Sequence, residues 1–541
     1  MKRWGPLVIL AAAQFVMVLD QAVMNVSISQ LVADLDTTVT AIQAVITLYS
    51  LVMAMFMVTG GKIGDLIGRR RAFTIGLVVY AMGSALTAVS PNVVCLAIGW
   101  SVLEGLGAAL VLPALAALIG GNYVDRDRRT AYAVIGGVAG AGIAVGPILG
   151  GWATTELSWR VVFLGEVVIV LAILASMRLL REAPREGARP HLDVVGAVLS
   201  ALGLGLVVLG VLQASTWGWL APKSSPIEPF GFALTPFVVA AGAVVLWLFV
   251  RWQRHRTAIG TDPLVHLELF GIRPLRAGLT ALTSQNLILM GIFFTIPLYL
   301  QLVLGFNALD TGLRMLPVSI AMFLASMAGS RLSQSLSTRT IVRAGFLAVL
   351  PAALLLLWTI RPSLSGGWFA LAMTLLGLGM GLVASQLGNV VQSSVDESGR
   401  SEAGGLQYTA QQLGSAIGVA LIGAIVLSGL TANWISRIDE DPRVSDEVTA
   451  QAEVAVSGRV SFVPADELRT AAEDAGVDPA TTDALVEDYE QAQLVALKAG
   501  LLASAAIALA ALALTGGLPS RRPDPDPASP EPVGPAEVAT G

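Results

Sequence analysis

Residues 136–151 read GGVAGAGIAVGPILGG, a run of small residues with a Gly-Pro pair inside an apolar segment. Gly136, Gly140, Gly146 and Gly150 leave one face of a helix without side chains, so a neighbouring helix can pack against its backbone. Pro147 removes one backbone hydrogen bond, which a membrane helix tolerates where its neighbours satisfy the freed carbonyl. The stretch predicts a kinked membrane helix in close contact with another helix. Taken alone, it also fits a packing helix of any membrane protein.

The composition of the chain is that of a polytopic membrane protein. Hydrophobic residues make up 55% of the 541 positions and charged residues 13%, whereas soluble globular proteins carry about 25% charged residues. Many separate apolar stretches are roughly 20 residues long, enough for a helix to cross a bilayer. A single cysteine, Cys95, excludes an intramolecular disulfide. The apolar run after Met1-Lys2-Arg3 continues to about Ser29 and contains an acid, so we interpret it as an uncleaved first span.

Fourteen spans are predicted, at 7–29, 41–60, 72–90, 93–116, 131–153, 160–178, 194–213, 233–251, 279–303, 310–332, 341–360, 367–390, 406–430 and 494–515. Lys and Arg gather in the loops on one side of these spans, whereas the short loops on the other side carry little beyond Arg160, Lys223 and Arg361. Cytoplasmic loops are the ones enriched in Lys and Arg, which places both termini in the cytoplasm.

The predicted organisation is a six-helix bundle in residues 1–185, two linker helices in 186–260 and a second six-helix bundle in 261–520. Residues 521–541 form a disordered cytoplasmic tail rich in Pro, Asp and Glu. The acidic segment 431–493 lies outside the cell, between spans 13 and 14. We expect it to be a solvated cap with short amphipathic helices at Asp466–Ala475 and Asp478–Glu490. Parallel six-helix halves are typical of transporters that bind substrate between the halves near the midplane.

The loop after the second span reads GKIGDLIGRRR at 61–71 and combines glycines, an acid and a basic cluster. Asp65 precedes Arg69 by four residues, a workable spacing for an ion pair. This loop resembles the signature loop of the major facilitator superfamily, and residues 136–151 resemble the antiporter motif of its exporters. The resemblance implies an all-α fold of two six-helix bundles plus two central helices. It also implies a conformational latch between the halves, formed by Gly61, Gly64, Asp65, Gly68, Arg69 and Arg70; an ordinary positively charged loop is the alternative.

Further stretches resemble the fourteen-helix drug:proton antiporter branch of that superfamily. They are LDQAVMNV at 19–26, SWRVVF at 158–163, HLDVVGA at 191–197, PLYLQ at 297–301, Thr311-Gly312 with Leu316-Pro317, and QLGSAIG at 412–418. The resemblance implies a proton-coupled exporter, in which helix 4 usually carries an arginine at the position of Ser101 and a glutamine at that of Glu104. Here the arginine is absent, so Asp20 lacks its expected cation.

Three acids lie within the predicted spans: Asp20, Glu104 and Glu166. Each costs about 2.5–3.5 kcal/mol even on a lenient insertion scale, so each should face a cavity or a partner. A buried acid without a cation favours its neutral form. We therefore predict that these three acids carry the coupled proton. The alternative for each acid is a structural role: Asp20 bonded to Asn25 or Gln21, Glu104 buried as a structural acid, and Glu166 near the surface beside Arg160.

Substrate contacts are predicted from polar and aromatic side chains inside the spans. Trp100 lies one turn before Glu104, and an indole beside a carboxylate suits a lipophilic cation; a lipid-facing Trp100 is the alternative. The remaining candidates are Asp20, Asn25, Gln285, Asn286, Phe293, Phe294, Tyr299, Gln386 and Asn389, with Gln14 and Gln301 as further polar candidates. Each polar side chain is equally suited to a hydrogen bond between helices.

The sequence thus predicts a proton-coupled antiporter that exports hydrophobic, cationic drugs or antibiotics across the cytoplasmic membrane. A carrier of the same fold for a lipid, an amino acid or one self-made antibiotic is the nearest alternative. A polytopic membrane enzyme is more remote, because His191, His255 and His266 lack metal-ligand spacing. We expect a monomer that binds a small hydrophobic substrate and protons, with no cofactor, metal or nucleic-acid partner.

Overall fold

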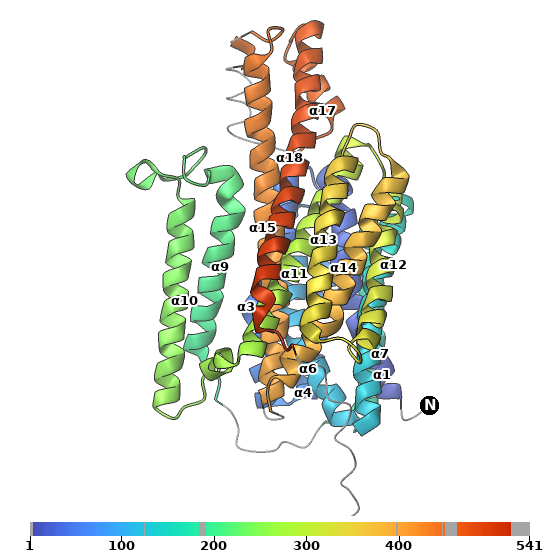
Figure 1. The fold of residues 1–541 in the computed structure, drawn as a ribbon, viewed down its shortest axis with the longest axis vertical. Coiled ribbons are helices and arrows are strands. Elements are labelled where there is room, and N and C mark those ends of the chain that lie inside the picture. Colours follow the sequence, from blue (N-terminus) through green and yellow to red (C-terminus); the bar gives the residue numbers. More distant parts are fainter. Residues whose placement is uncertain are drawn as a thin grey trace, which may run out of the picture.

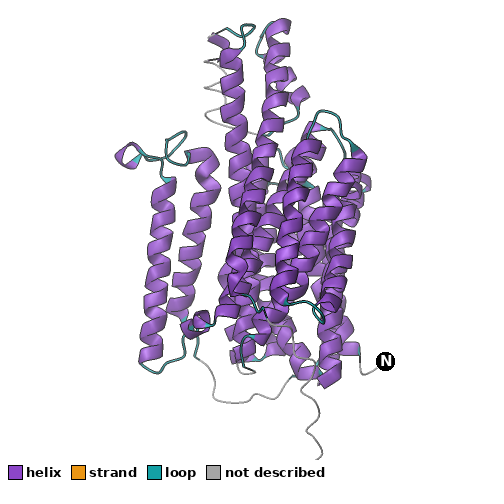
Figure 2. Cartoon of the chain, in the orientation of Figure 1, coloured by secondary structure: helices purple, strands orange, loops and turns teal. Residues whose placement is uncertain are grey.

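The computed structural model describes residues 4–123, 125–182, 191–396, 399–445, 447–449 and 462–520. These residues form helices and loops without a strand (Figure 2). Twelve helices in this part of the chain are long and apolar enough to cross a membrane. Two more, α7 (Asp125–Glu156) and α8 (Trp159–Ala175), occupy the predicted fifth and sixth spans. The predicted all-α membrane fold is confirmed, while the predicted tail 521–541 lies outside the described residues.

The first half of the chain contains six spans. They are α1 (Gly5–Val26), α3 (Val39–Ile67), α4 (Arg69–Ala88), the continuous run α5 (Val93–Leu96), η1 (Ala97–Glu104) and α6 (Gly105–Asn122), then α7 and α8, with α2 (Ile28–Asp34) after α1 and η2 (Met177–Leu179) after α8. Side chains of Thr38, Asn92 and Ser158 accept backbone N–H groups at the starts of α3, α5 and α8, as helix N-caps do. The η1 segment is a π-helix, a form found frequently at functional sites.

Two helices between the halves, α9 (Val194–Trp217) and α10 (Thr235–Ala258), stand beside the main bundle (Figure 1). Asp193 joins them at one end. Its carboxylate accepts hydrogen bonds from the Gly196 N–H at 2.9 Å, the Trp252 indole at 2.8 Å and the Gln253 amide at 2.8 Å. The acid of the HLDVVGA stretch is thus an N-cap that also holds the second helix of the pair. A 3₁₀ turn, η3 (Pro229–Gly231), lies in the loop between α9 and α10.

The second half contains another six spans. They are α11 (Arg273–Leu298) continued by the π-helix η5 (Tyr299–Val303), α12 (Ala308–Leu332), α13 (Thr338–Thr359), α14 (Gly366–Ser393), α15 (Arg400–Glu440) and α18 (Pro479–Leu514), with 3₁₀ turns η4 (Leu267–Gly271) and η7 (Thr515–Gly517). Arg339 donates to the carbonyls of Gly516 at 2.8 Å and Leu518 at 2.9 Å. These bonds satisfy carbonyls that follow α18, which would otherwise lack partners at a helix end.

The last two long helices extend far beyond the bundle (Figure 1). At 41 residues, α15 is about 60 Å long, against a bilayer core of about 30 Å. The short α17 (Ala465–Asp474) lies beside them, close to the predicted helix at Asp466–Ala475. The prediction of a separate short helix at Asp478–Glu490 is wrong, because Asp478 caps α18 and the helix then runs unbroken into its membrane span. The Trp434 indole donates to the Leu485 carbonyl at 3.1 Å, so the projecting parts pack together.

We call the end of the molecule that carries α17 the cap end, and the end that carries Gly5 and the 61–71 loop the basic end. Near the cap end, amide side chains link the two halves. Gln301 donates to the Val26 carbonyl at 2.9 Å and accepts from the Ser29 hydroxyl at 2.6 Å. Gln43 donates to the Val419 carbonyl at 2.9 Å. These links hold the halves together at the cap end in this structure.

Backbone contacts between α7 and α12 complete the cap-end seam. A Cβ atom added at Gly151 would lie closer than 3.0 Å to the Ala308 carbonyl oxygen and to Leu309 Cα. A Cβ atom at Gly312 would likewise meet the backbone of Pro147. Glycine is therefore required on both helices where the halves meet.

We predict that Gly151→Val opens the cap-end seam. Overpacking of this kind costs about 1–3 kcal/mol, so the closed arrangement loses population. The measurement is the labelling rate of a cysteine introduced by Thr155→Cys in a Cys95→Ser background, since the Thr155 hydroxyl accepts from Leu309 N–H across the same seam. Gly137→Val, on the same helix but with no atom within 4 Å, is the matched control. Equal labelling rates in the two variants would contradict the prediction.

Candidate functional site

Three helices of the first half bring the predicted acids together. Asp20 lies on α1, Glu104 ends η1 and Glu166 lies on α8. One oxygen of each carboxyl group lies within 4.8 Å of the others. The side chains are 0%, 0% and 1% exposed, respectively. The structure thus joins three residues that are far apart in sequence into one buried carboxyl cluster.

Asp20 is held by an indole. The Trp100 Nε1–H donates to Asp20 Oδ1 at 2.7 Å. The Trp100 ring stacks on Tyr49 of α3 with centroids 4.5 Å apart and planes 2° apart. Trp100 is buried, so the alternative of a lipid-facing Trp100 is wrong. Asn25 donates instead to the Gln21 carbonyl at 2.8 Å, so the donor groups beside Asp20 are the Trp100 indole and the Tyr49 hydroxyl.

Glu104 fits against α4 because two glycines allow close approach. A Cβ atom at Gly83 would lie closer than 3.0 Å to Glu104 Cγ and to the Glu104 backbone nitrogen. A Cβ atom at Gly99 would similarly meet Thr87. The Thr87 hydroxyl lies 2.9 Å from the Gly83 carbonyl oxygen and 3.3 Å from Glu104 Oε1. The π-helical turn therefore ends with its carboxylate against the neighbouring helix.

Glu166 is bound by hydroxyl groups of α4. The Tyr80 hydroxyl donates to Glu166 Oε2 at 3.0 Å, and the Ser84 hydroxyl lies 3.1 Å from the same oxygen. Arg160 is engaged elsewhere, with the Ser90 carbonyl at 3.0 Å and with Asp34 at 3.5 Å. The alternative that places Glu166 near the surface beside Arg160 is wrong.

The carboxyl cluster has more oxygens than donors. Asp20 Oδ2, Glu104 Oε2 and Glu166 Oε1 are buried and have no hydrogen-bond partner. None of the ion pairs among the described residues includes one of these acids. Two unit charges 4.8 Å apart repel by about 3–4 kcal/mol at an effective dielectric constant of 20. The cluster is suited to hold protons or to share one bound cation.

Most of the other predicted substrate contacts donate to backbone carbonyls within the second half, between helices except for Asn286, which bonds within α11. The donors to backbone carbonyls are Gln285 to Met380 at 3.1 Å, Asn286 to Leu282 at 3.0 Å, Gln386 to Gly329 at 2.9 Å and Tyr299 to Arg361 at 2.7 Å. Phe293 and Phe294 are buried in the core, whereas Asn389 is exposed. Gln14 is buried, with its amide oxygen unpartnered.

Several residues around the cluster were not predicted. Tyr80, Ser84 and Thr87 follow the i, i+4, i+7 spacing of one helix face, and this polar stripe on an otherwise apolar span is the signal that could identify them. Gln21, the residue after Asp20, donates to Gln412 of the other half at 3.4 Å. No spacing in either helix identifies that pair in advance, because it depends on how the two halves meet.

Gly142, Gly146 and Gly150 of the 136–151 stretch face α1. A Cβ atom at Gly146 would meet Ala22, and one at Gly150 would lie closer than 3.0 Å to the Val23 Cα. The helix that carries Asp20 is therefore packed directly on the backbone of α7. No contact of Gly136 or Gly140 is described.

The prediction of a loop over 61–71 is too long, because residues 61–67 end α3, residues 69–71 begin α4, and only Gly68 lies between them. We keep the name 61–71 loop for this tight turn and its flanks. Gly68 has φ of 102°, which only glycine adopts readily. Asp65 pairs with Arg69 at 3.3 Å, both partly exposed, and Gly64 lies against Ala72. The predicted ion pair is present within the loop, while the role of the loop as a latch between halves stays a prediction.

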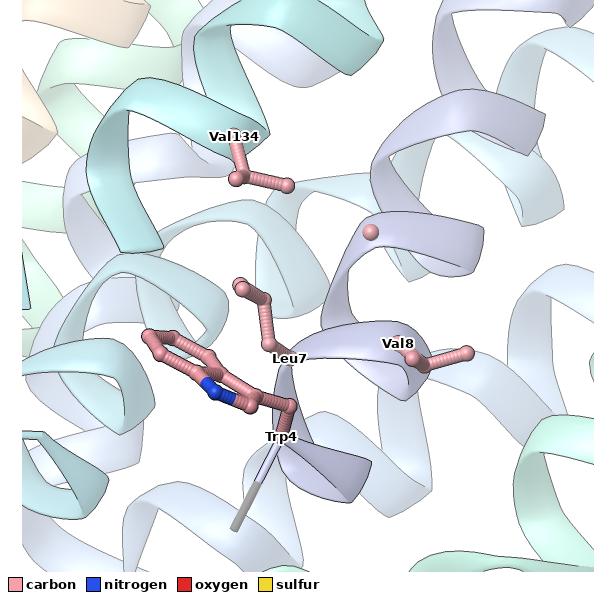
Figure 3. Close-up of a pocket in the computed structure, with 5 residues that line it drawn as sticks. Trp4, Leu7, Val8 and Val134 are labelled. Atoms are coloured by element: carbon pink, nitrogen blue, oxygen red, sulfur yellow. The ribbon is translucent and has the colours of Figure 1, made fainter. Parts of the chain in front are cut away.

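A cavity of about 390 Å³ opens between α1 and α7 at the basic end. Its lining is apolar: Trp4, Leu7, Val8, Ala11 and Val134. Figure 3 shows Leu7 between Trp4 and Val134. The lining of this cavity contains none of the predicted site residues.

Comparisons with known proteins identify the relatives of the chain. Residues 10–419 match the family model described as Major Facilitator Superfamily. The chain is 28% identical over 538 residues to the tetracenomycin C resistance and export protein of Streptomyces glaucescens, covering 98% of this chain and 94% of that protein. It is 30% identical over 435 residues to the cephamycin export protein CmcT of Amycolatopsis lactamdurans, covering 79% and 86%.

A solved structure shows the same fold. It is a bacterial homologue of the human lysosomal transporter Spinster in an inward-facing and unoccupied conformation, with a TM-score of 0.58, 15% identity, and coverage of 95% of this chain and 98% of that one. At this level of identity, the likeness concerns the fold alone.

We predict that Gly83→Ala disturbs the carboxyl cluster, because the added methyl group would occupy the space of Glu104. Overpacking at such a site costs about 1–3 kcal/mol, so the melting temperature of the purified protein should fall. Gly165→Ala, beside Glu166 but with no atom within 4 Å, is the matched control and should leave the melting temperature unchanged. A Gly83→Ala protein as stable as that control would show that α4 and η1 are not tightly packed here.

Proposed function

The chain belongs to the major facilitator superfamily, and on that premise we propose that it exports hydrophobic, cationic drugs or antibiotics in exchange for protons. Its relatives are antibiotic export and resistance proteins, and the chain is a drug efflux transporter, not an enzyme. The observation that carries the proton-coupled part of the proposal is the buried carboxyl cluster, which pairs with no Lys or Arg in the described part of the chain. Such a cluster can exchange protons and attract a cationic substrate.

The proposed orientation places the basic end in the cytoplasm and the cap end outside, because Lys and Arg are enriched in cytoplasmic loops. Both termini are then cytoplasmic. The links at Gln43 and Gln301 join the halves at the cap end in this structure, which supports alternating access with the substrate entering from the inner side. The protein acts as a monomer in this proposal, with the 61–71 loop as the latch that is remade in each cycle.

Asp20, Glu104 and Glu166 carry the coupled protons in this proposal. Asp20 is joined through the α1 backbone to Gln21, which donates to Gln412 of the other half. A change in charge at Asp20 can therefore alter the contact between the halves. We propose that the substrate approaches this seam, where Asn25 has an unpartnered amide oxygen, with Trp100 and Glu104 behind it.

A second candidate is the export of one antibiotic rather than many drugs. It is favoured by the names of the two relatives, each of which refers to a single antibiotic. The two candidates share the proton site and differ in the number of compounds that the transporter accepts.

The proposed function predicts proton-driven efflux that depends on Asp20. Cells that express the chain are loaded with cationic, neutral and anionic dyes, and efflux is followed with and without a protonophore. Asp20→Asn keeps the size of the side chain and an oxygen for the Trp100 N–H, but it cannot exchange a proton. It should therefore abolish efflux driven by an imposed pH gradient. Asp34→Asn, outside the cluster, is the control acid, and retained pH-driven efflux in Asp20→Asn would contradict the proposal.

Glu104→Gln should separate cationic from neutral substrates. Removal of the charge should lower export of cationic dyes about tenfold or more, a loss of about 1.4 kcal/mol or more. It should lower export of neutral dyes far less. The two rates are compared at equal expression of the variant and the parent chain. Equal losses for both classes of dye would show that Glu104 is structural.

A further inference from the structure

We infer that the carboxyl cluster carries two protons in each transport cycle, so that export of a monovalent cation moves one net charge. The inference rests on the proposed function and deepens it, because it assigns the number of coupled ions. Three observations support it: the spacing of the three acids, the absence of a neighbouring cation among the described residues, and the count of hydrogen-bond donors.

Repulsion limits the negative charge that the cluster can hold. With carboxyl oxygens within 4.8 Å of one another, a second charge costs about 3–4 kcal/mol, and three charges cost about 10 kcal/mol from repulsion alone. Burial of each charge in an apolar bundle adds a further cost. The cluster therefore holds at most one negative charge when it is enclosed, which requires at least two protons.

Among the residues that the structure describes, the surroundings of the cluster offer no positive charge to offset this repulsion. The other titratable groups that face it are phenols, Tyr49 from α3 and Tyr80 from α4, which are neutral at physiological pH. Lys62 lies 13 residues from Tyr49 along α3, about 20 Å. On α4, Arg71 lies 9 residues from Tyr80, about 13 Å. On α8, Arg160 is bound to Asp34 and Ser90.

Hydrogen bonding sets an upper limit on the number of protons that the cluster holds. One oxygen of each acid has a donor beside it. The donor is Trp100 for Asp20 and Thr87 for Glu104, and Glu166 has both Tyr80 and Ser84. The other three oxygens are buried without partners, and the Tyr49 hydroxyl near Asp20 is likewise buried without one. Two protons on these three oxygens supply two O–H donors and leave one charged acceptor. Three protons leave no charged acceptor, and one proton leaves two charges. Two bound protons is therefore the number that matches the geometry of the cluster.

Exchange of two protons for one monovalent cation has a thermodynamic signature. A pH difference of one unit then supports a cation gradient of about 100-fold, against about tenfold for one proton. The two-proton exchange also moves one net charge, so an opposing voltage can stop it. At 59 mV for each tenfold, the 100-fold driving force corresponds to about 120 mV. A one-proton exchange of a monovalent cation moves no net charge, so no voltage stops it.

The test measures the voltage at which net dye flux stops. The full-length protein is placed in lipid vesicles with equal ethidium on both sides, a pH difference of one unit, and a voltage set by potassium and valinomycin. We expect the parent chain to stop near 120 mV. Glu166→Gln keeps Asp20, the acid joined through Gln21 to the other half, and leaves two carboxyl groups with one proton to exchange. Its flux should therefore continue at every voltage. Glu104→Gln gives the same comparison where Glu166→Gln does not fold, and Asp34→Asn should stop near 120 mV.

The outcomes separate this inference from the proposed function. Flux driven by the pH difference but insensitive to voltage in the parent chain means one proton, which overturns the inference and leaves proton-coupled export intact. A stopping voltage near 90 mV means three protons and also overturns it. Flux that follows a sodium gradient, or no flux driven by pH, contradicts the proposed function itself.

Discussion

Repulsion between carboxyl groups in an apolar bundle is the constraint on which the first half of this protein depends. Asp20, Glu104 and Glu166 arrive from three helices at one enclosed place, and each would be costly there without compensation. The neighbouring features serve this arrangement. Gly83 and Gly99 let η1 and α4 touch, the π-helical turn ends at Glu104, and Tyr80, Ser84, Thr87 and Trp100 supply the donors. The remaining charge is then controlled by protons, because no lysine or arginine among the described residues pairs with the acids.

The same constraint links the cluster to the seam between the halves. Asp20 lies on α1, which packs on the glycines of α7. In turn, α7 packs on α12 of the other half through Gly151 and Gly312. Gln21 adds a direct hydrogen bond to Gln412. Close backbone packing leaves little room for independent movement of these helices. We propose that a change in the proton load of the cluster moves α1 and α7 together and so alters the cap-end seam.

Much of this fold could be predicted from the sequence, because hydropathy, small-residue spacing and the positions of Lys and Arg act locally. The three acids stood out for the same reason, since a charge within an apolar span is costly wherever it lies. Their convergence could not be predicted, because it depends on the π-helical turn and on which faces of α1, η1 and α8 meet. The environment of Glu166 was also decided by packing: Arg160 is near in sequence but turns to Asp34. The start of α18 was misjudged because hydropathy marks where a membrane span begins, whereas the cap at Asp478 marks where the helix begins.

The central claim is that this cluster releases its protons when substrate binds, and proton release on binding tests it most directly. Purified protein in weakly buffered detergent solution receives a monovalent organic cation, and a pH indicator reports the protons set free for each bound cation. The account predicts release from the parent chain, and none from a chain that carries Asp20→Asn, Glu104→Gln and Glu166→Gln but remains folded by its melting curve. The same proton release from the parent chain and from this triple variant would place the coupled protons elsewhere and contradict the account.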